Sequence, residues 1–182
     1  MAGLILQTPS QAHLPSFRAA LAEYHAEGRH LELDVEMLPE YIAGLTDRTT
    51  KLKPGRVPET VLWGVLNREY VGRVSLRHEL TAGLEAWGGH IGYEVRPSMR
   101  GRGYAHALLT GILPHARALG LKRVLLHCDD SNVASIRVIE KAGGVLDGLV
   151  INPGGETGRR YWIELSQSGR FATAKLVRLE GK

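Results

Sequence analysis

The stretch that decides the fold reads HIGYEVRPSMRGRGYAHALL, from His90 to Leu109, and continues after a further strand as CDDSNVASIRVIEKAGG, from Cys128 to Gly144. A strand pattern, a glycine-rich turn and a helical pattern follow one another, and a second strand and a second helix complete the unit. The turn consists of Arg100, Gly101, Arg102, Gly103, Tyr104 and Ala105. The first N–H groups of a helix are unpaired, and glycines let an anion approach them closely. This turn is therefore expected to bind a phosphate-bearing ligand.

Antiparallel strands are expected before the turn. The expected strands are residues 4–7, 60–66, 71–77 and 90–95, and the expected helices are residues 15–26 and 39–45. The second and third strands are β-rich runs at hairpin spacing, which favours antiparallel pairing. Residues 47–58 contain two prolines and a glycine and are predicted to form a loop, and residues 78–89 are predicted to form a longer connection.

Helices and strands are expected to alternate after the turn. An apolar stripe with helical spacing predicts a helix over residues 105–119, ended by Gly120. The segments that follow are predicted as a strand at 121–128, a helix at 133–142, and strands at 145–151 and 160–165. Residues 166–182 could form an edge strand, a dimer contact or a frayed end, and the sequence does not decide between them. A homodimer therefore also stays open.

Length and composition fit a single domain over residues 1–182. The chain has 182 residues, of which 43% are hydrophobic, and this is enough for one buried core. Cys128 is the only cysteine, which excludes an internal disulfide and a cysteine zinc cluster and favours a reducing, cytoplasmic location. The N-terminus lacks a signal-peptide pattern and no run approaches the roughly 20 apolar residues of a membrane span, so no membrane partner is expected. The eight histidines are dispersed, and no metal site is predicted.

The charge and the aromatic content bear on the class of ligand. A formal net charge of +4 favours anionic ligands. Only 6% of the residues are aromatic, and no run alternates aromatic with basic residues as single-strand nucleic-acid binding surfaces do. The composition therefore argues against a nucleic-acid partner.

Two other interpretations compete with a phosphate site at the glycine turn. One is an exposed tight turn whose two arginines are solvated. The other is a dinucleotide-binding fold, because Gly101, Gly103 and either Ala105 or His106 approximate its fingerprint. Asp129 follows the next strand, where that fold places a ribose partner. However, the fingerprint follows its strand almost at once in a parallel sheet, whereas residues 96–100 intervene here and antiparallel strands come first.

The run RGRGYA resembles the Q/R-x-x-G-x-G/A signature of the GNAT superfamily of N-acetyltransferases. Other motifs agree in order: a strand ending in YEVRP at Pro97, and Asn132-x-x-Ser135 leading into EKAGG. The chain is similar to a poorly characterised branch of predicted acetyltransferases. The resemblance implies an α/β fold of the α+β type, with helices flanking a mixed, mostly antiparallel central sheet that is splayed between its fourth and fifth strands.

Acetyl-CoA is the co-substrate that this resemblance implies. Pantetheine would lie in the opening of the sheet, against main-chain groups of Tyr93, Val95 and Arg96. The pyrophosphate would bind the backbone of the turn residues 100–105. Asn132 and Ser135 would flank the pantetheine arm, although both residue types are also common in helix capping.

The implied reaction is direct attack by a primary amine on the acetyl thioester, with a small molecule or a peptide as the acceptor. Such a reaction needs a base for the ammonium proton. Strand alternation places His90, Gly92 and Glu94 on one face, so Glu94 and His90 are the candidate bases. The other interpretations are a salt-bridged strand residue for Glu94 and a strand-end residue for His90.

The resemblance leaves the proton donor for the departing thiolate unassigned. The family's tyrosine seven residues after the asparagine is Ile139 here, and its aromatic residue after the terminal glycine is Gly144. Tyr161 is the candidate substitute, with strand packing as the other interpretation. Cys128 is expected to be a buried thiol rather than a nucleophile. Two alternatives to an acetyltransferase stay open: a CoA-binding module without catalysis and a dinucleotide-binding oxidoreductase.

Overall fold

The computed structural model describes residues 3–46 and 55–165. Most of the loop expected at 47–58 and the whole segment 166–182, with its alternatives of edge strand, dimer contact or frayed end, lie outside the described residues. In the described part of the chain, no helix is long and apolar enough to cross a membrane.

Four antiparallel strands form the first sheet, in the order β1-β2-β3-β4. The strands are β1 (Ile5–Gln7), β2 (Glu59–Leu66), β3 (Glu69–Arg77) and β4 (Ile91–Val95). Asn67 and Arg68 join β2 to β3 with φ angles of 49° and 69°. Two consecutive residues in the left-handed region make the tight turn that matches the twist of a hairpin, which explains the predicted antiparallel pairing.

A second, three-stranded antiparallel sheet has the order β5-β7-β6. Its strands are β5 (Arg123–Asp129), β6 (Val145–Ile151) and β7 (Thr157–Glu164). An isolated bridge between Gly89 and Leu126 joins β5 to the residues just before β4. A Cβ atom on Gly89 would lie 2.4 Å from the backbone oxygen of Leu125, so only glycine permits this close approach. Beyond the bridge β4 and β5 diverge, which confirms the expected α/β fold with a mostly antiparallel sheet splayed between its fourth and fifth strands.

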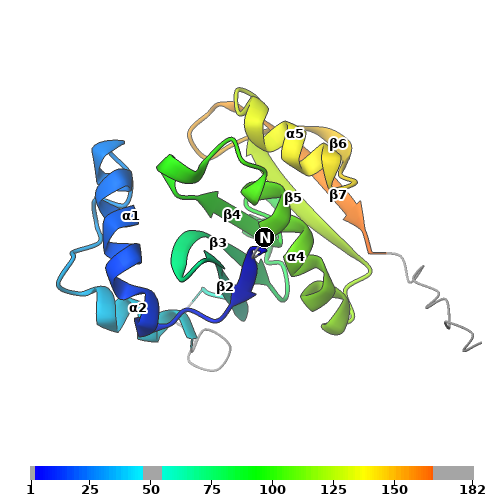
Figure 1. The fold of residues 1–182 in the computed structure, drawn as a ribbon. Helices are drawn as coiled ribbons and strands as arrows, with labels where there is room; N and C mark the ends of the chain where they lie inside the picture. The colour runs from blue at the N-terminus through cyan, green and yellow to red at the C-terminus, as the bar shows by residue number, and fades with distance from the viewer. Residues whose placement is uncertain (1–2, 47–54, 166–182) are drawn as a thin grey trace, which may run out of the picture.

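Helices cover both faces of the first sheet, and the second sheet has helices on one face (Figure 1). Helices α1 (Leu14–Ala26) and α2 (Leu38–Thr46) lie on one face, and α4 (Tyr104–Ala118) and α5 (Val133–Lys141) lie on the other. Short helical turns precede α1 at η1 (Gln11–His13) and follow β4 at η2 (Pro97–Met99). Helix α3 (Ala82–Ala86), capped by the Thr81 side chain, was not predicted, because five residues are too few to show a helical period.

Each face has its own apolar core. Between α1, α2 and the sheet, the ring of Phe17 packs 4.7 Å from Trp63 and 5.0 Å from Tyr70, measured between ring centroids. On the other face the stripe of α4 packs on the central strands. Its fully buried members are Leu108, Leu109, Ile112 and Ala116. Burying one such side chain stabilises the fold by about 1.5–3 kcal/mol, so these cores fix α1 and α4 on either side of the opening next to β4.

Candidate active site

A cavity of about 570 Å³ lies where β4 and β5 diverge. Its walls come from β4, the glycine turn, the first residues of α4 and α5, and Arg29 after α1. The predicted cofactor residues that line it are Tyr93, Val95, Arg100, Gly101, Gly103, Tyr104, Ala105, Asn132 and Ser135. Arg96 and Arg102 are the two that do not. This volume lies within the range of small-molecule and cofactor sites.

The glycine turn presents open space in front of the α4 N-terminus. Gly101 and Gly103 have φ angles of 75° and 82°, a backbone region that favours glycine, and Gly103 is the N-cap of α4. An added Cβ at either glycine would meet no protein atom within 4 Å. The first helical bond runs from the Ala107 N–H to the Gly103 oxygen, so the amides that precede it have no helical partner. This open space, bordered by donors and a helix dipole, fits a pyrophosphate.

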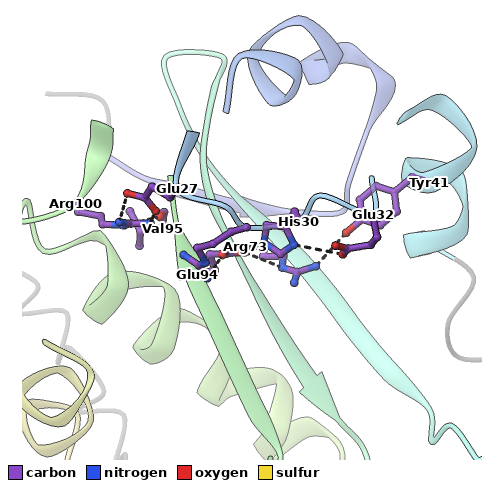
Figure 2. Close-up of polar contacts among 9 residues, drawn as sticks. Glu27, His30, Glu32, Tyr41, Arg73, Glu94, Val95 and Arg100 are labelled. Atoms are coloured by element: carbon purple, nitrogen blue, oxygen red, sulfur yellow. Dashed lines mark hydrogen bonds and ion pairs between the residues drawn. The ribbon is translucent and has the colours of Figure 1, made fainter. Parts of the chain in front are cut away.

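Two arginines near the turn, Arg96 and Arg100, pair with glutamates at the C-terminal end of α1. The guanidinium of Arg100 donates two hydrogen bonds of 2.8 Å to Glu27, as Figure 2 shows, and Arg96 donates one of 2.7 Å to Glu23. Hydrogen bonding to Arg100 lowers the pKa of Glu27. Arg102 is exposed and donates to the Ser98 oxygen. The turn therefore offers its backbone amides to a phosphate, while the charge of Arg100 is already paired.

Main-chain groups of β4 alternate between β3 and the opening. The N–H of Arg96 donates to the Val71 oxygen at 2.8 Å, so this amide belongs to the β3 side. The Val95 oxygen accepts from Arg100 Nε at 3.3 Å and so faces away from β3. In an antiparallel pair, alternate residues bond to the same neighbour, so Tyr93 shares the orientation of Val95. Tyr93 and Val95 thus present main-chain groups to the cavity, and Arg96 does not present its N–H.

Asn132 and Ser135 form a helix cap that also borders the cavity. The Asn132 side chain accepts a 3.0 Å hydrogen bond from the Ser135 N–H and caps α5, and both residues line the cavity. The Tyr93 hydroxyl donates to the Ser135 oxygen at 3.4 Å, and burial raises the pKa of Tyr93 to about 12. Ile139, where the resemblance has a tyrosine, is buried in the core below α5. No proton donor is therefore available at that position.

Glu94 lies on the opposite face of β4 from Tyr93, as strand alternation predicts, and its side chain is only 9% exposed. One carboxylate oxygen pairs with Arg29, and His30 Nε2 lies 2.8 and 3.0 Å from the two oxygens. Arg73 Nε lies 3.6 Å away (Figure 2). Glu94 is therefore an ion-paired strand residue, as one of the two sequence-based interpretations expected, and it also lines the cavity.

A second cavity of about 450 Å³ opens on the α1 and α2 side of the sheet. It shares Arg29, Tyr93 and Glu94 with the first cavity. Most of its other lining is polar or charged, including His30, Glu32, Arg56, Arg73 and Arg77. The two cavities meet at Glu94; the first is bordered by the glycine turn and the second has mostly polar walls.

His90 and Tyr161 lie away from both cavities. His90 Nδ1 accepts a 2.9 Å hydrogen bond from the Leu125 N–H, and burial lowers the pKa of His90. The Tyr161 hydroxyl donates to Glu140 at 3.2 Å, and its ring is fully buried. Cys128 is buried in the core, where burial raises the pKa of its thiol to about 11. These contacts favour structural roles for all three side chains.

Arg29 and His30 are two residues of this region that the sequence did not single out. They follow α1, and His30 has a left-handed φ of 55°. Neither residue belongs to a motif or to a periodic segment, so no sequence signal indicated them. In the described ranges, no group of three or more histidine, cysteine, aspartate or glutamate side chains is arranged to hold a metal ion.

Splayed antiparallel strands, a glycine turn at a helix N-terminus and a cavity between them define an acetyltransferase-type fold. Residues 3–145 match the family model described as acetyltransferase (GNAT) domain. The chain therefore belongs to the GNAT acetyltransferase family, as its motifs predicted. An N-acetyltransferase with acetyl-CoA as co-substrate is the activity expected of this family.

Similar solved structures and one curated relative agree with this family. The acetyltransferase of Salmonella typhimurium that modifies the N-terminal serine of ribosomal protein L7/L12 has 17% identity and a TM-score of 0.65, covering 90% of this chain and 95% of that one. The yncA protein of the same organism, solved with acetyl-CoA, has 16% identity and a TM-score of 0.64, with coverage of 90% and 95%. A mycothiol acetyltransferase of Streptosporangium roseum is 45% identical over 49 residues, which are 27% of this chain and only 14% of that protein.

Proposed function

We propose that this protein transfers the acetyl group of acetyl-CoA to a primary amine by direct attack. The observation that carries the proposal is the meeting of two cavities at Glu94, Tyr93 and Arg29. One cavity has the glycine turn for a pyrophosphate, and the other has room and polar walls for an acceptor. Two reactants held on either side of one strand need little further ordering before they react, which lowers the entropic part of the barrier.

The cofactor side is assigned as follows. The amides of Gly101 to Ala105 would bind the pyrophosphate, and Asn132 and Ser135 would border the pantetheine arm. Main-chain groups of Tyr93 and Val95 face the opening. An N–H in this position would stabilise the negative charge that develops on the thioester oxygen. Acetyl-CoA itself supplies an activated acyl group whose thiolate leaves readily near neutral pH.

On the acceptor side, Glu94 remains our candidate for a part in removing the proton of the amine. The buried contacts of His90 and Tyr161 argue against a direct part for them in proton transfer. The relatives support an amine as acceptor, because the Salmonella enzyme described above modifies an N-terminal serine. The polar second cavity supports a hydrophilic acceptor, either a small molecule or a peptide terminus.

Calorimetry and a thiol-release assay test this proposal. We expect acetyl-CoA and CoA to bind and NAD not to bind. We also expect CoA release with at least one acceptor from a panel of spermidine, amino acids, aminoglycosides and a peptide with an N-terminal serine. Binding of CoA without turnover of any acceptor would favour a non-catalytic CoA-binding module. Tight binding of NAD without CoA would indicate an oxidoreductase instead.

A further inference from the structure

His30 lies at the edge of the second cavity, in the segment between α1 and α2. Its φ of 55° is uncommon for a residue other than glycine, and such conformations persist only where the surroundings hold them. The His30 oxygen accepts hydrogen bonds of 2.9 Å from the Leu33 N–H and from His25 Nε2. The His30 ring packs edge-on against Tyr24, with the centroids 5.1 Å apart. The ring is therefore held in place from several sides, although its side chain is still 21% exposed.

The contacts of the ring select one tautomer. Nε2 lies 2.8 and 3.0 Å from the oxygens of Glu94, and an ionised carboxylate can only accept hydrogen bonds. Nε2 therefore carries the proton, and in the neutral ring Nδ1 carries the lone pair. Nδ1 is 3.7 Å from the carboxylate of Glu32, beyond hydrogen-bond distance, and the Glu32 side chain is 73% exposed. Nδ1 is thus free to accept a proton.

Glu94 is less well placed to accept a proton itself. One of its oxygens is shared by Arg29 and His30, and the other by His30 and Arg73. The titratable and charged groups that contact His30 or line the space around it are Tyr24 and His25 from α1, Arg29 and Glu32 from the same segment, Tyr41 from α2, Arg56 before β2 and Glu59 at its start, Tyr70, Arg73 and Arg77 from β3, and Glu94 from β4. Among these groups Glu94 is the one that bonds to the ring, so it can orient the ring and stabilise its protonated form.

We propose that His30 accepts the proton of the attacking amine and that Glu94 is its positioning residue. This proposal rests on the proposed function. In the step, the amine nitrogen forms a bond to the acetyl carbon, the C–S bond breaks and the sulfur keeps the electron pair. The surplus proton on the nitrogen moves to His30 Nδ1, from which the thiolate or solvent takes it and restores the neutral ring.

Three variants test the role of His30. His30→Asn removes the imidazole, and asparagine tolerates the left-handed backbone. His30→Gly fits the same backbone and leaves space for added imidazole. His115→Asn is the matched control, because His115 is exposed on α4 and lines neither cavity. Thermal unfolding and the CoA affinity of each variant, by calorimetry, show whether the fold and the cofactor site persist.

With an amine that the wild-type protein acetylates, we expect His30→Asn to lower kcat by about 100-fold or more, the usual scale of a general base. Added imidazole should restore part of the activity of His30→Gly, and His115→Asn should match the wild type. The ratio of wild-type to His30→Asn kcat/KM should rise with pH and level off, since this ratio cancels the ionisation of the amine. A His30→Asn protein that stays within about threefold of wild type in kcat, or a ratio that is flat with pH, overturns the proposal.

A second measurement does not depend on the acceptor. Nitrogen NMR of the histidine rings in the CoA-bound protein should show His30 protonated at Nε2 and not at Nδ1, with this preference lost in Glu94→Gln. The opposite tautomer overturns the proposal even if the protein is an active acetyltransferase. Conversely, failure to bind CoA would overturn the proposed function, so the two failures are distinguishable.

Discussion

Gly103 gives the sharpest test of the cofactor site, because α4 carries a matched control at its other end. Gly103 has a φ of 82° and Gly120 a φ of 80°, and an added Cβ would meet no protein atom within 4 Å at either position. Alanine in the left-handed region costs roughly 1–2 kcal/mol, so both Gly103→Ala and Gly120→Ala should lower the free energy of unfolding by a similar amount. Denaturant titration measures this loss.

The two variants should differ in CoA affinity. At Gly103 the new methyl group occupies the space assigned to the pyrophosphate and interferes with its hydrogen bonds to backbone N–H groups. Hydrogen bonds to a charged group are worth about 1.5–3 kcal/mol, so the loss of one predicts a Kd for CoA about 10- to 100-fold higher. Gly103→Glu should abolish binding while the circular dichroism spectrum stays nearly unchanged, because a carboxylate would repel the phosphates. If calorimetry gives Gly103→Ala and Gly120→Ala the same Kd within about twofold, the phosphate site does not lie at this turn.

Three further predictions follow from side-chain contacts. Glu94→Gln should lower kcat more than acetyl-CoA affinity, and an unchanged pH–rate profile would contradict any part for Glu94 in proton transfer. Tyr161→Phe should cost about 1 kcal/mol of stability in denaturant titration, through the lost bond to Glu140, and leave kcat unchanged. Burial lowers the pKa of His127 to about 4, and its ring nitrogens have no hydrogen-bond partner among the described residues. The unfolded chain, with a histidine pKa of about 6.5, binds this proton first, so stability should fall by about 2 kcal/mol between pH 7 and pH 5. His127→Leu should remove that part of the pH dependence.

The pattern of apolar and turn-forming residues was enough to predict most helices and strands, because these elements are determined by residues close together in the sequence. The stripe of α4 and its end at Gly120, the helix α5 and the strand β6 are set by consecutive residues, and the sequence placed them within one or two positions. Helix α3 was missed because five residues hold no full helical repeat. The separation of β4 from β5 was predicted only from the family resemblance. It depends on the close approach of Gly89 to Leu125, a contact between distant residues that no periodic pattern indicates.

In the candidate site, too, the features set by neighbouring residues could be predicted and those set by distant contacts could not. The glycine turn could be predicted because its backbone conformation depends on neighbouring residues, and alternation placed Glu94 on the correct face of its strand. The contact of Glu94 with His30 could not be predicted, because His30 lies 64 positions away and has no motif of its own. Alternation also grouped His90 with Glu94, but His90 precedes the strand and its ring bonds to β5. A two-residue period applies only inside a strand.

The end of α1 ties the two halves of the site together. Glu23 and Glu27 are four residues apart at the C-terminal end of α1 and so lie on the same side, where Glu23 binds Arg96 after β4 and Glu27 binds Arg100 of the glycine turn. Three positions after Glu27, His30 reaches Glu94 between the two cavities. Since α1 is fixed by its own aromatic core, its position affects the glycine turn and the wall of the second cavity together. A change that shifts α1 should therefore alter CoA affinity and amine turnover together, whereas Gly103→Ala should alter CoA affinity first.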